Sequence, residues 1–271
     1  ENLLNFTGAT TRIGNVDDGT TVSDFDDEEK RRNISLFTSV LPVVYKNVKF
    51  NFLDTPGYTD FVGEVVSAMR VADCALVLVD SVGGLEVGTE TALDLANEFN
   101  MPKIIVINKM DRDNANFRKA LDSVSNGIND RLIPMQLPWG EKADFQGVID
   151  LVTMKAYKGD GKTATEIPAE LKDEAEEARM VLVEAAAEGE DTLLEKYFEN
   201  GDLTSEEIVQ GLRKAIQESN IIPVLTAAGG HMIGVGPLME ALLALAPSPA
   251  ERPAVVANSP KGDVELTFDD A

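Results

Sequence analysis

The chain has 271 residues, of which 44% are hydrophobic and 26% charged, proportions typical of a globular protein with one or two domains. Its 24 basic and 47 acidic residues give a net charge of −23, which excludes a generally basic binder of nucleic-acid phosphates. One cysteine and one histidine exclude a disulfide framework and a paired-histidine metal site, and no apolar run is long enough to span a membrane.

The first 53 residues predict a helix end, a loop and a β-hairpin. Residues 1–13 are typical of a helix that closes at Gly8, and the polar, acidic stretch 14–33 predicts a long mobile loop. Two apolar segments, 34–45 and 48–53, flank Lys46 and Asn47 and predict the hairpin.

From residue 50 onward, short apolar runs alternate with helical patterns. The predicted strands are 50–53, 74–79, 103–107 and 221–225, and the predicted helices are 60–72, 89–100, 115–129 and 237–246. Unbroken apolar strands between helices indicate an α/β fold, with a mostly parallel sheet that is covered by helices on both faces.

Residues 141–220 interrupt this alternation and carry 20 acidic and 9 basic residues, nearly half of the net negative charge. They predict a strand-like stretch at 147–157 and helices near 169–188, 192–200 and 205–219. We therefore expect four parts, which are a core at 1–140, an acidic inserted α+β subdomain at 141–220, a return to the core at 221–252, and the start of a following β domain at 253–271.

The motif DTPG at residues 54–57 follows the predicted strand 50–53. Ligands of an open parallel sheet bind beyond the carboxyl ends of its strands. An aspartate there can hold hydrated Mg²⁺, and a glycine N–H can approach a phosphate oxygen. Because all four residue types are also common in turns, this motif by itself is equally consistent with an ordinary turn.

The motif NKMD at residues 108–111 follows the predicted strand 103–107. A carboxylate at this point can accept the N1 and 2-amino hydrogens of guanine, and adenine offers no such pair. Asn108 can bond the base acceptors, and the Lys109 stem can lie on the ring. A polar loop without a ligand is the alternative. The two motifs together, in this order at the ends of two parallel strands, predict a guanine-nucleotide site.

These two tetrapeptides resemble the third and fourth nucleotide motifs of translational GTPases. Residues 32–36 (RNISL) resemble their switch I, residues 54–61 (DTPGYTDF) their switch II, and residues 149–156 the start of the inserted G′ subdomain of the elongation factor G family. The resemblance implies a P-loop-type GTPase core that binds GTP/GDP with Mg²⁺ and hydrolyses GTP on the ribosome in the cytoplasm.

On the phosphate side, the resemblance implies that Asp54 and Ser35 bind Mg²⁺ and that Gly57 senses the γ-phosphate. Tyr58 stands where the family has a histidine that orients the attacking water. Since a tyrosine with a pKa near 10 is a poor base at neutral pH, hydrolysis is expected to be slow or conditional, or Tyr58 only packs within switch II. The motif G-x-x-x-x-G-K-[ST] is absent, so we expect this chain to bind GTP weakly or not at all.

On the base side, the resemblance implies that Asn108, Lys109 and Asp111 read guanine. A weak fifth motif would include Ala228 and Gly229, and the Gly229 N–H would serve guanine O6. The family's serine that braces the base-binding aspartate is lost at Ala228. Thr226 either compensates or only starts a loop, and the loop histidine, His231, is expected to be solvated and without a role.

The resemblance implies the ribosome as partner, including its stalk protein and the rRNA factor-binding site, with no DNA or membrane partner and a monomeric chain. The acidic face of the helix predicted at 169–188 would meet the stalk protein, or it is simply a solvated face. Two other functions stay open. One is a GTP-binding module that docks on ribosomes and hydrolyses little, and the other is a ribosomal protection or peptide-release GTPase.

Overall fold

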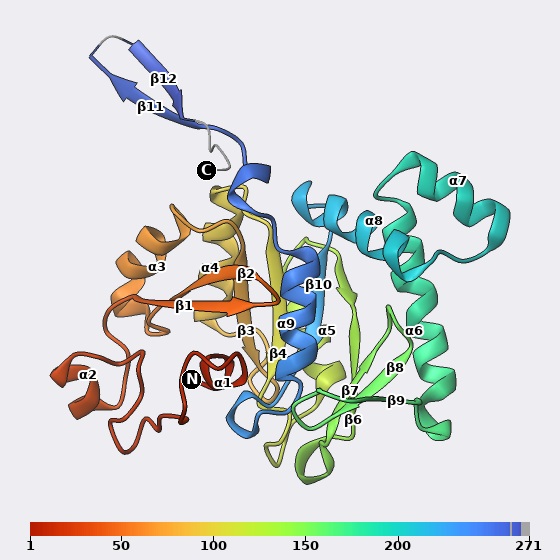
Figure 1. Ribbon diagram of the computed structural model, residues 1–271, viewed down its shortest axis with the longest axis horizontal. Helices are drawn as coiled ribbons and strands as arrows, with labels where there is room; N and C mark the ends of the chain where they lie inside the picture. The colour runs from red at the N-terminus through yellow and green to blue at the C-terminus, as the bar shows by residue number, and fades with distance from the viewer. Residues whose placement is uncertain (261, 267–271) are drawn as a thin grey trace.

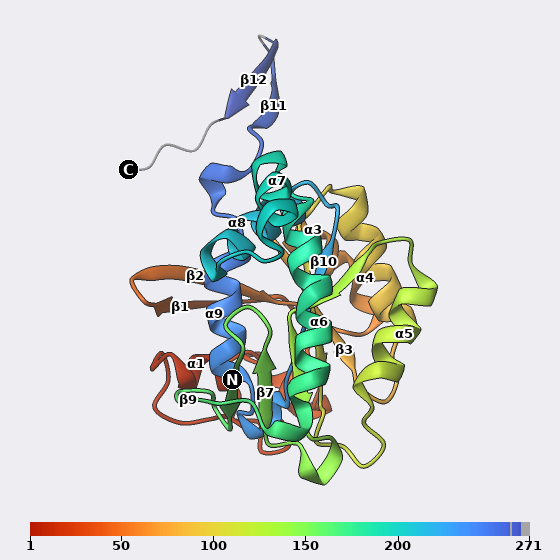
Figure 2. The same cartoon turned by 90° about the vertical axis from the view of Figure 1, so that its right-hand side faces the viewer.

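The computed structural model describes residues 1–260 and 262–266. The central sheet has four strands in the order β3-β4-β10-β5, and every pairing in it is parallel. Strands β3, β4 and β10 lie near the middle of the molecule in Figure 1. The strands are β3 (Ala75–Asp80), β4 (Lys103–Asn108), β10 (Ile222–Thr226) and β5 (Leu132–Pro134). Figure 2 shows α4 (Val87–Glu98) and α5 (Phe117–Gly127) on one face of this sheet and α9 (Val235–Leu245) on the other. The α/β class with a parallel sheet covered on both faces is therefore confirmed.

The core of the molecule lies on the two central strands, β4 and β10. All five residues of β10 are buried, as are the first five of β4, and most are β-branched or leucine. Ile105 lies opposite Val224 and Ile107 opposite Thr226 in the parallel register. Because neighbouring parallel strands end on the same edge of a sheet, the loops that follow β4 and β10 start side by side.

The predicted hairpin is confirmed as β1 (Ser39–Tyr45) and β2 (Val48–Asp54), paired antiparallel. Its two turn residues, Lys46 and Asn47, both have left-handed backbone angles, as a two-residue hairpin turn requires. The prediction that β2 belongs to the parallel sheet is wrong, since within the described residues it pairs with β1 alone. Its side chains Phe50 and Phe52 pack against the main core and also against a small cluster that contains Leu4 of α1 (Asn2–Phe6).

The N-terminal segment is more ordered than its composition predicts. Helix α1 ends at Phe6, and Gly8 takes a left-handed conformation, as expected. The prediction of an unbroken loop at 14–33 is wrong, because the segment contains α2 (Asp27–Arg32). Asp26 and Glu29 form a reciprocal capping box, and acidic residues in its first turn and basic residues in its last turn complement the helix dipole.

The segment from residue 136 to residue 217 contains an antiparallel sheet and three helices. The sheet contains β6 (Gln136–Trp139), β7 (Gly147–Asp150), β8 (Lys155–Lys158) and β9 (Ala164–Thr165). The helices are α6 (Ala169–Ala187), α7 (Asp191–Asn200) and α8 (Ser205–Gln217). The predicted stretch 147–157 is two strands, because a turn with a left-handed Met154 separates β7 from β8.

Helix α3 (Val62–Met69) follows the hairpin after a short 3₁₀ turn (Thr59–Phe61). At the C-terminal end, β11 (Val255–Ser259) and β12 (Gly262–Leu266) form an antiparallel hairpin. The predicted β segment at 253–271 also includes residues 261 and 267–271, which lie outside the described residues. Among the helices in the described ranges, none is long and apolar enough to cross a membrane.

Candidate functional site

Hydrogen bonds join the loop after β4 to the loop after β10. The Gly229 N–H donates to Asn108 Oδ1 at 2.9 Å, and the Met110 N–H donates to the Ala227 carbonyl at 3.3 Å. These bonds link residues more than a hundred positions apart, and they form because the parent strands are neighbours in the sheet. The structure therefore brings the NKMD motif and the predicted fifth motif into one site.

Asp111 also contacts the loop after β10, through His231. The two atoms His231 Nδ1 and Asp111 Oδ2 are 2.5 Å apart. Because an ionised carboxylate only accepts hydrogen bonds, Nδ1 is the donor in this contact. The side chain of Asp111 is 26% exposed and that of His231 is 72% exposed. His231 is thus solvent-exposed, as expected, and it also contacts the Asp111 carboxylate, which was not expected.

Lys109 and Arg112 share one carboxylate, that of Asp80. Lys109 Nζ lies 3.1 Å and Arg112 Nη1 lies 2.7 Å from Asp80 Oδ2. Burial acts to raise the pKa of Asp80, but the Val82 and Gly83 N–H groups and the Lys109 ammonium outweigh it, and the pKa falls to about 2. Asp80 thus stays ionised and anchors the Lys109 ammonium, while the side chain of Lys109 remains 58% exposed.

Sequence reasoning missed Asp80, although a usable signal was present. Asp80 is the last residue of β3 and lies opposite Asn108 in the parallel register. Like Asp54, Asp80 is a carboxylate at the end of an apolar strand, where ligands of an open parallel sheet bind.

The fifth-motif residues are placed as follows. Ala228 is buried and pairs with Ile233 across the loop. The Gly229 N–H, expected to serve the base, is used by Asn108, and a Cβ on Gly229 would come within 3.4 Å of Asn108 Oδ1. Thr226 ends β10 as a buried residue, and its Oγ1 has no partner among the described residues. Thr226 therefore does not replace the missing serine as a contact of the aspartate.

The two predicted Mg²⁺ ligands lie in different segments. Ser35 Oγ donates to Asp24 Oδ1 at 2.7 Å, and Thr21 Oγ1 donates to the other oxygen of Asp24 at 2.9 Å. Asp54 ends β2, and no bond between Asp54 and Ser35 is present in residues 1–260. Asp24, which sequence reasoning did not distinguish from its acidic neighbours, is buried and holds Ser35 in place.

Desolvation has the largest influence on the Asp54 carboxylate. Desolvation raises the pKa of Asp54 above its usual value, and the carboxylates of Asp24 and Glu1 raise it further, while the N-terminal ammonium lowers it. Within the described part of the chain, no three histidine, cysteine, aspartate or glutamate side chains form a metal cage. Mg²⁺ in nucleotide sites usually takes one or two carboxylates plus phosphate oxygens, so the oxygen donors present fit such an ion.

Gly57 and Tyr58 lie on the surface after β2. A Cβ added to Gly57 would meet no atom within 4 Å, so the backbone there is open to a ligand. Tyr58 is 58% exposed and precedes the 3₁₀ turn, where its carbonyl accepts the Phe61 N–H at 3.0 Å. The alternative that Tyr58 packs within switch II is not what this structure shows.

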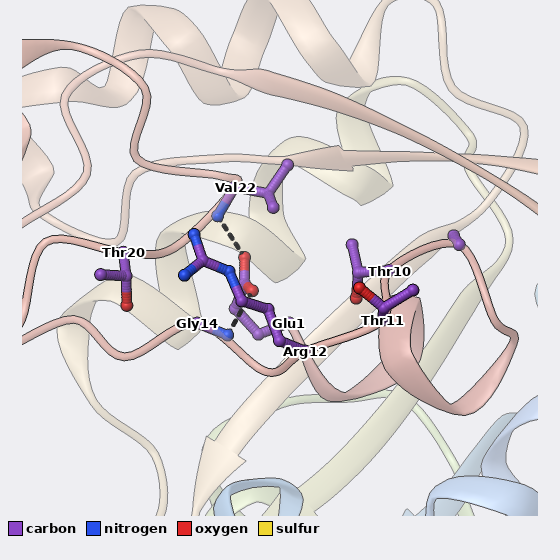
Figure 3. Close-up of a pocket in the computed structure, with 8 residues that line it drawn as sticks. Glu1, Thr10, Thr11, Arg12, Gly14, Thr20 and Val22 are labelled. Atoms are coloured by element: carbon purple, nitrogen blue, oxygen red, sulfur yellow. Dashed lines mark hydrogen bonds between the residues drawn. The ribbon is translucent and has the colours of Figure 1, made fainter.

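A pocket of about 310 Å³ opens beside the N-terminus, and Figure 3 shows its lining residues. The Glu1 carboxylate accepts N–H bonds from Gly14 at 3.0 Å and Val22 at 2.6 Å. Burial acts to raise the pKa of Glu1, but these donors outweigh it and the pKa is lowered. None of the sequence-predicted site residues lines this pocket.

Three comparisons with known proteins agree. Residues 1–248 match the family described as the elongation factor Tu GTP binding domain. The chain is 40% identical over 260 residues to elongation factor G of Thermotoga neapolitana, which covers 94% of this chain and 37% of that protein. A crystal structure of a Thermus thermophilus protein matches with a TM-score of 0.86 and 31% identity, over 98% of this chain and 45% of that chain.

The chain thus spans less than half the length of both relatives. The family match covers all the sequence-predicted site residues, from Ser35 to Gly229, together with the parallel sheet that positions the base-side loops. The resemblance stated from the motifs is confirmed, and this chain belongs to the elongation factor Tu GTP binding domain family of translational GTPases.

Proposed function

We propose that this chain is the GTPase region of an elongation-factor-G-like translation factor, and that in the full-length protein the guanine base binds beyond the carboxyl ends of β4 and β10. The observation that carries this proposal is the pair of joined loops, in which Asn108 and Asp111 contact Gly229 and His231. Among the described residues, Asp111 Oδ1 has no hydrogen-bond partner, so it is available to a ligand.

Base recognition follows from the chemistry of these side chains. Asp111 accepts the N1 and 2-amino hydrogens of guanine, and adenine would leave the carboxylate unpaired. Lys109, held at its ammonium by Asp80, places its apolar stem along the ring face. The exclusion of adenine therefore depends on a single carboxylate, and the lysine contributes packing rather than selectivity.

The phosphate side would be served by Asp54, Ser35 and Gly57. Mg²⁺, when bound by Asp54 and Ser35, supplies positive charge that neutralises the charge developing on the transferred phosphoryl group. Gly57, which lies on the surface after β2, would offer its N–H to the γ-phosphate. Tyr58 would orient water only through a hydrogen bond, because its phenol is a weak base at neutral pH.

We further propose a cytoplasmic protein whose partner is the ribosome, including the stalk protein and the rRNA factor-binding site. In this proposal residues 141–220 form the acidic subdomain between core segments 1–140 and 221–252. Glu170, Glu177 and Glu184 are exposed on α6, whereas Glu174 pairs with Arg118 at 2.6 Å. Three free carboxylates thus remain to steer a basic partner surface.

The test is nucleotide binding by the protein at its natural full length, measured by calorimetry with GDP, ADP and their triphosphates. Guanine nucleotides are expected to bind at micromolar concentrations or below, and adenine nucleotides at least 100-fold more weakly. Equal affinity for GDP and ADP would contradict the proposal.

A second candidate is a GTP-binding module that docks on ribosomes and hydrolyses little. The exposed tyrosine at position 58, in place of a histidine, favours it. Single-turnover hydrolysis with and without ribosomes separates the two functions. A ribosome-stimulated rate supports the GTPase, and an unstimulated, slow rate supports the docking module.

A further inference from the structure

We infer that His231 is a positioning residue for base recognition, which holds the Asp111 carboxylate in the orientation that guanine requires. The inference rests on the proposed guanine site and adds a residue to it. Its basis is the contact of 2.5 Å between His231 Nδ1 and Asp111 Oδ2, which joins residues 120 positions apart in the chain.

The loop after β10 presents His231 in a fixed place. The His231 N–H donates to the Ala228 carbonyl at 3.0 Å, and Ala228 and Ile233 exchange two backbone bonds of 3.0 and 3.2 Å across the loop. Met232 closes this turn in a left-handed conformation. The backbone from 228 to 233 is thus closed on itself, so the imidazole leaves it from a defined point.

The geometry also leaves room for the base. The contact engages only one carboxylate oxygen, and Oδ1 has no partner within residues 1–260. A carboxylate has about four acceptor positions, so Oδ2 can accept a second hydrogen while it remains bonded to His231. The contact therefore orients Asp111 without blocking the two donors on the guanine edge.

No other side-chain donor in the described part of the chain replaces His231 at this carboxylate. The hydroxyl of Thr226 is buried within β10, and the cationic groups of Lys109 and Arg112 are bound to Asp80. Without His231, the carboxylate of Asp111 would rotate between rotamers in the free protein. Binding would then have to order it, which lowers affinity through the loss of preorganisation.

The experiment uses the full-length protein and measures dissociation constants for GDP and for inosine diphosphate, which lacks the 2-amino group. His231→Ala is expected to weaken GDP binding about two- to fivefold, the range of an exposed charged contact. The binding of inosine diphosphate should weaken less than that of GDP, because inosine diphosphate makes one hydrogen bond fewer to the Asp111 carboxylate. The affinity for GDP divided by the affinity for inosine diphosphate should therefore be smaller in the variant than in the natural protein.

Two further variants separate positioning from general damage to the loop. His231→Asn places an amide N–H near the position of Nδ1 and should restore most of the GDP affinity and the ratio. Gly230→Ala is the matched loop control, since a Cβ there meets no atom within 4 Å, and it should change neither constant.

The outcomes are distinct. Unchanged or tighter GDP binding in His231→Ala overturns the inference, and tighter binding would mean that the imidazole competes with the base. Asp111→Asn is measured alongside. If Asp111→Asn weakens GDP binding and His231→Ala does not, only the inference about His231 fails and the proposed base site stands. If Asp111→Asn leaves GDP affinity unchanged, the proposed base site is wrong and the inference falls with it.

Discussion

The base side and the phosphate side of the proposed site are built in different ways. On the base side, Asn108 and Asp111 follow a strand buried at the centre of the parallel sheet, and hydrogen bonds join them to the neighbouring loop. On the phosphate side, Asp54 ends a strand of a separate hairpin, and Ser35 lies in an irregular segment before β1.

Buried carboxylates, rather than a sheet, organise the phosphate-side segment. Asp24 accepts the Ser35 hydroxyl, and Glu29 accepts backbone N–H groups from Leu36 at 2.9 Å and Phe37 at 3.1 Å. Glu29 is fully buried. The base-side loops are therefore positioned by strands of the hydrophobic core, whereas the phosphate-side segment is held in place by hydrogen bonds to buried carboxylates.

The largest effect should come from the core beneath the base side. Ile107→Ala removes a side chain that is 1% exposed in β4 and should lower the free energy of unfolding by about 2–5 kcal/mol. Val40→Ala in β1, where the side chain is 62% exposed, should change it by less than about 0.5 kcal/mol. Urea unfolding followed by circular dichroism measures both, and equal losses would contradict the contrast.

The second-largest effect is expected on guanine-nucleotide binding, when Asp111 is replaced. Asp111→Asn exchanges a charged acceptor for an amide and should cost about 2–4 kcal/mol of GDP binding, because two hydrogen bonds to a charged group are lost. Xanthosine diphosphate, which presents an acceptor in place of the 2-amino group, should bind better than before. Calorimetry with the full-length protein checks both, and two unchanged affinities would remove residues 108–111 from the base site.

A smaller effect is expected at Glu29, on the phosphate side. Burial acts to raise the pKa of Glu29, but the backbone N–H donors outweigh it and lower the pKa. A carboxylate whose pKa is lower in the folded state than in the unfolded state stabilises the fold at pH values above its unfolded-state pKa of about 4.3. This contribution to stability is lost as the pH falls through the folded-state pKa. Glu29→Gln should therefore cost about 1–3 kcal/mol at pH 7 and progressively less below pH 4.

The control for Glu29 is Glu28→Gln, which alters the neighbouring carboxylate. Glu28 makes surface ion pairs with Arg31 and Arg32 and should contribute little to stability. Urea unfolding of both variants from pH 7 down to pH 3 gives the comparison. If Glu29→Gln lowers the free energy of unfolding by the same amount at every pH in this range, the charge of Glu29 does not contribute to stability.

The smallest effect should come from the acidic face of α6. Changing Glu170, Glu177 and Glu184 to lysine should slow ribosome-stimulated GTP turnover a fewfold at low salt, through a reduced association rate. The difference should shrink as ionic strength rises above about 0.15 M, where the Debye length is about 8 Å.

The same change of charge on α4 serves as its control. Glu90, Asp94 and Glu98 are exposed there, and their replacement by lysine alters the net charge equally. If both triple variants slow turnover to the same extent, net charge alone explains the effect and the α6 face has no special role.

The amino-acid sequence was enough to predict the α/β class, the hairpin turn at Lys46 and Asn47, and the location of the base motif after a buried strand. These features arise from local patterns, such as apolar runs, helical periodicity and turn residues, which act within about ten positions. The motif spacing was also enough to identify the family resemblance that the comparisons confirmed.

The side-chain contacts of the site could not be predicted from the sequence, because they depend on how the folded chain brings distant residues together. The contacts between His231 and Asp111, Lys109 and Asp80, and Ser35 and Asp24 join residues 120, 29 and 11 positions apart. They depend on which strands are neighbours and on where each loop returns, and composition gives no information about either. For the same reason a buried, bonded Asp24 could not be told apart from the solvated carboxylates beside it, because burial is a property of the folded chain.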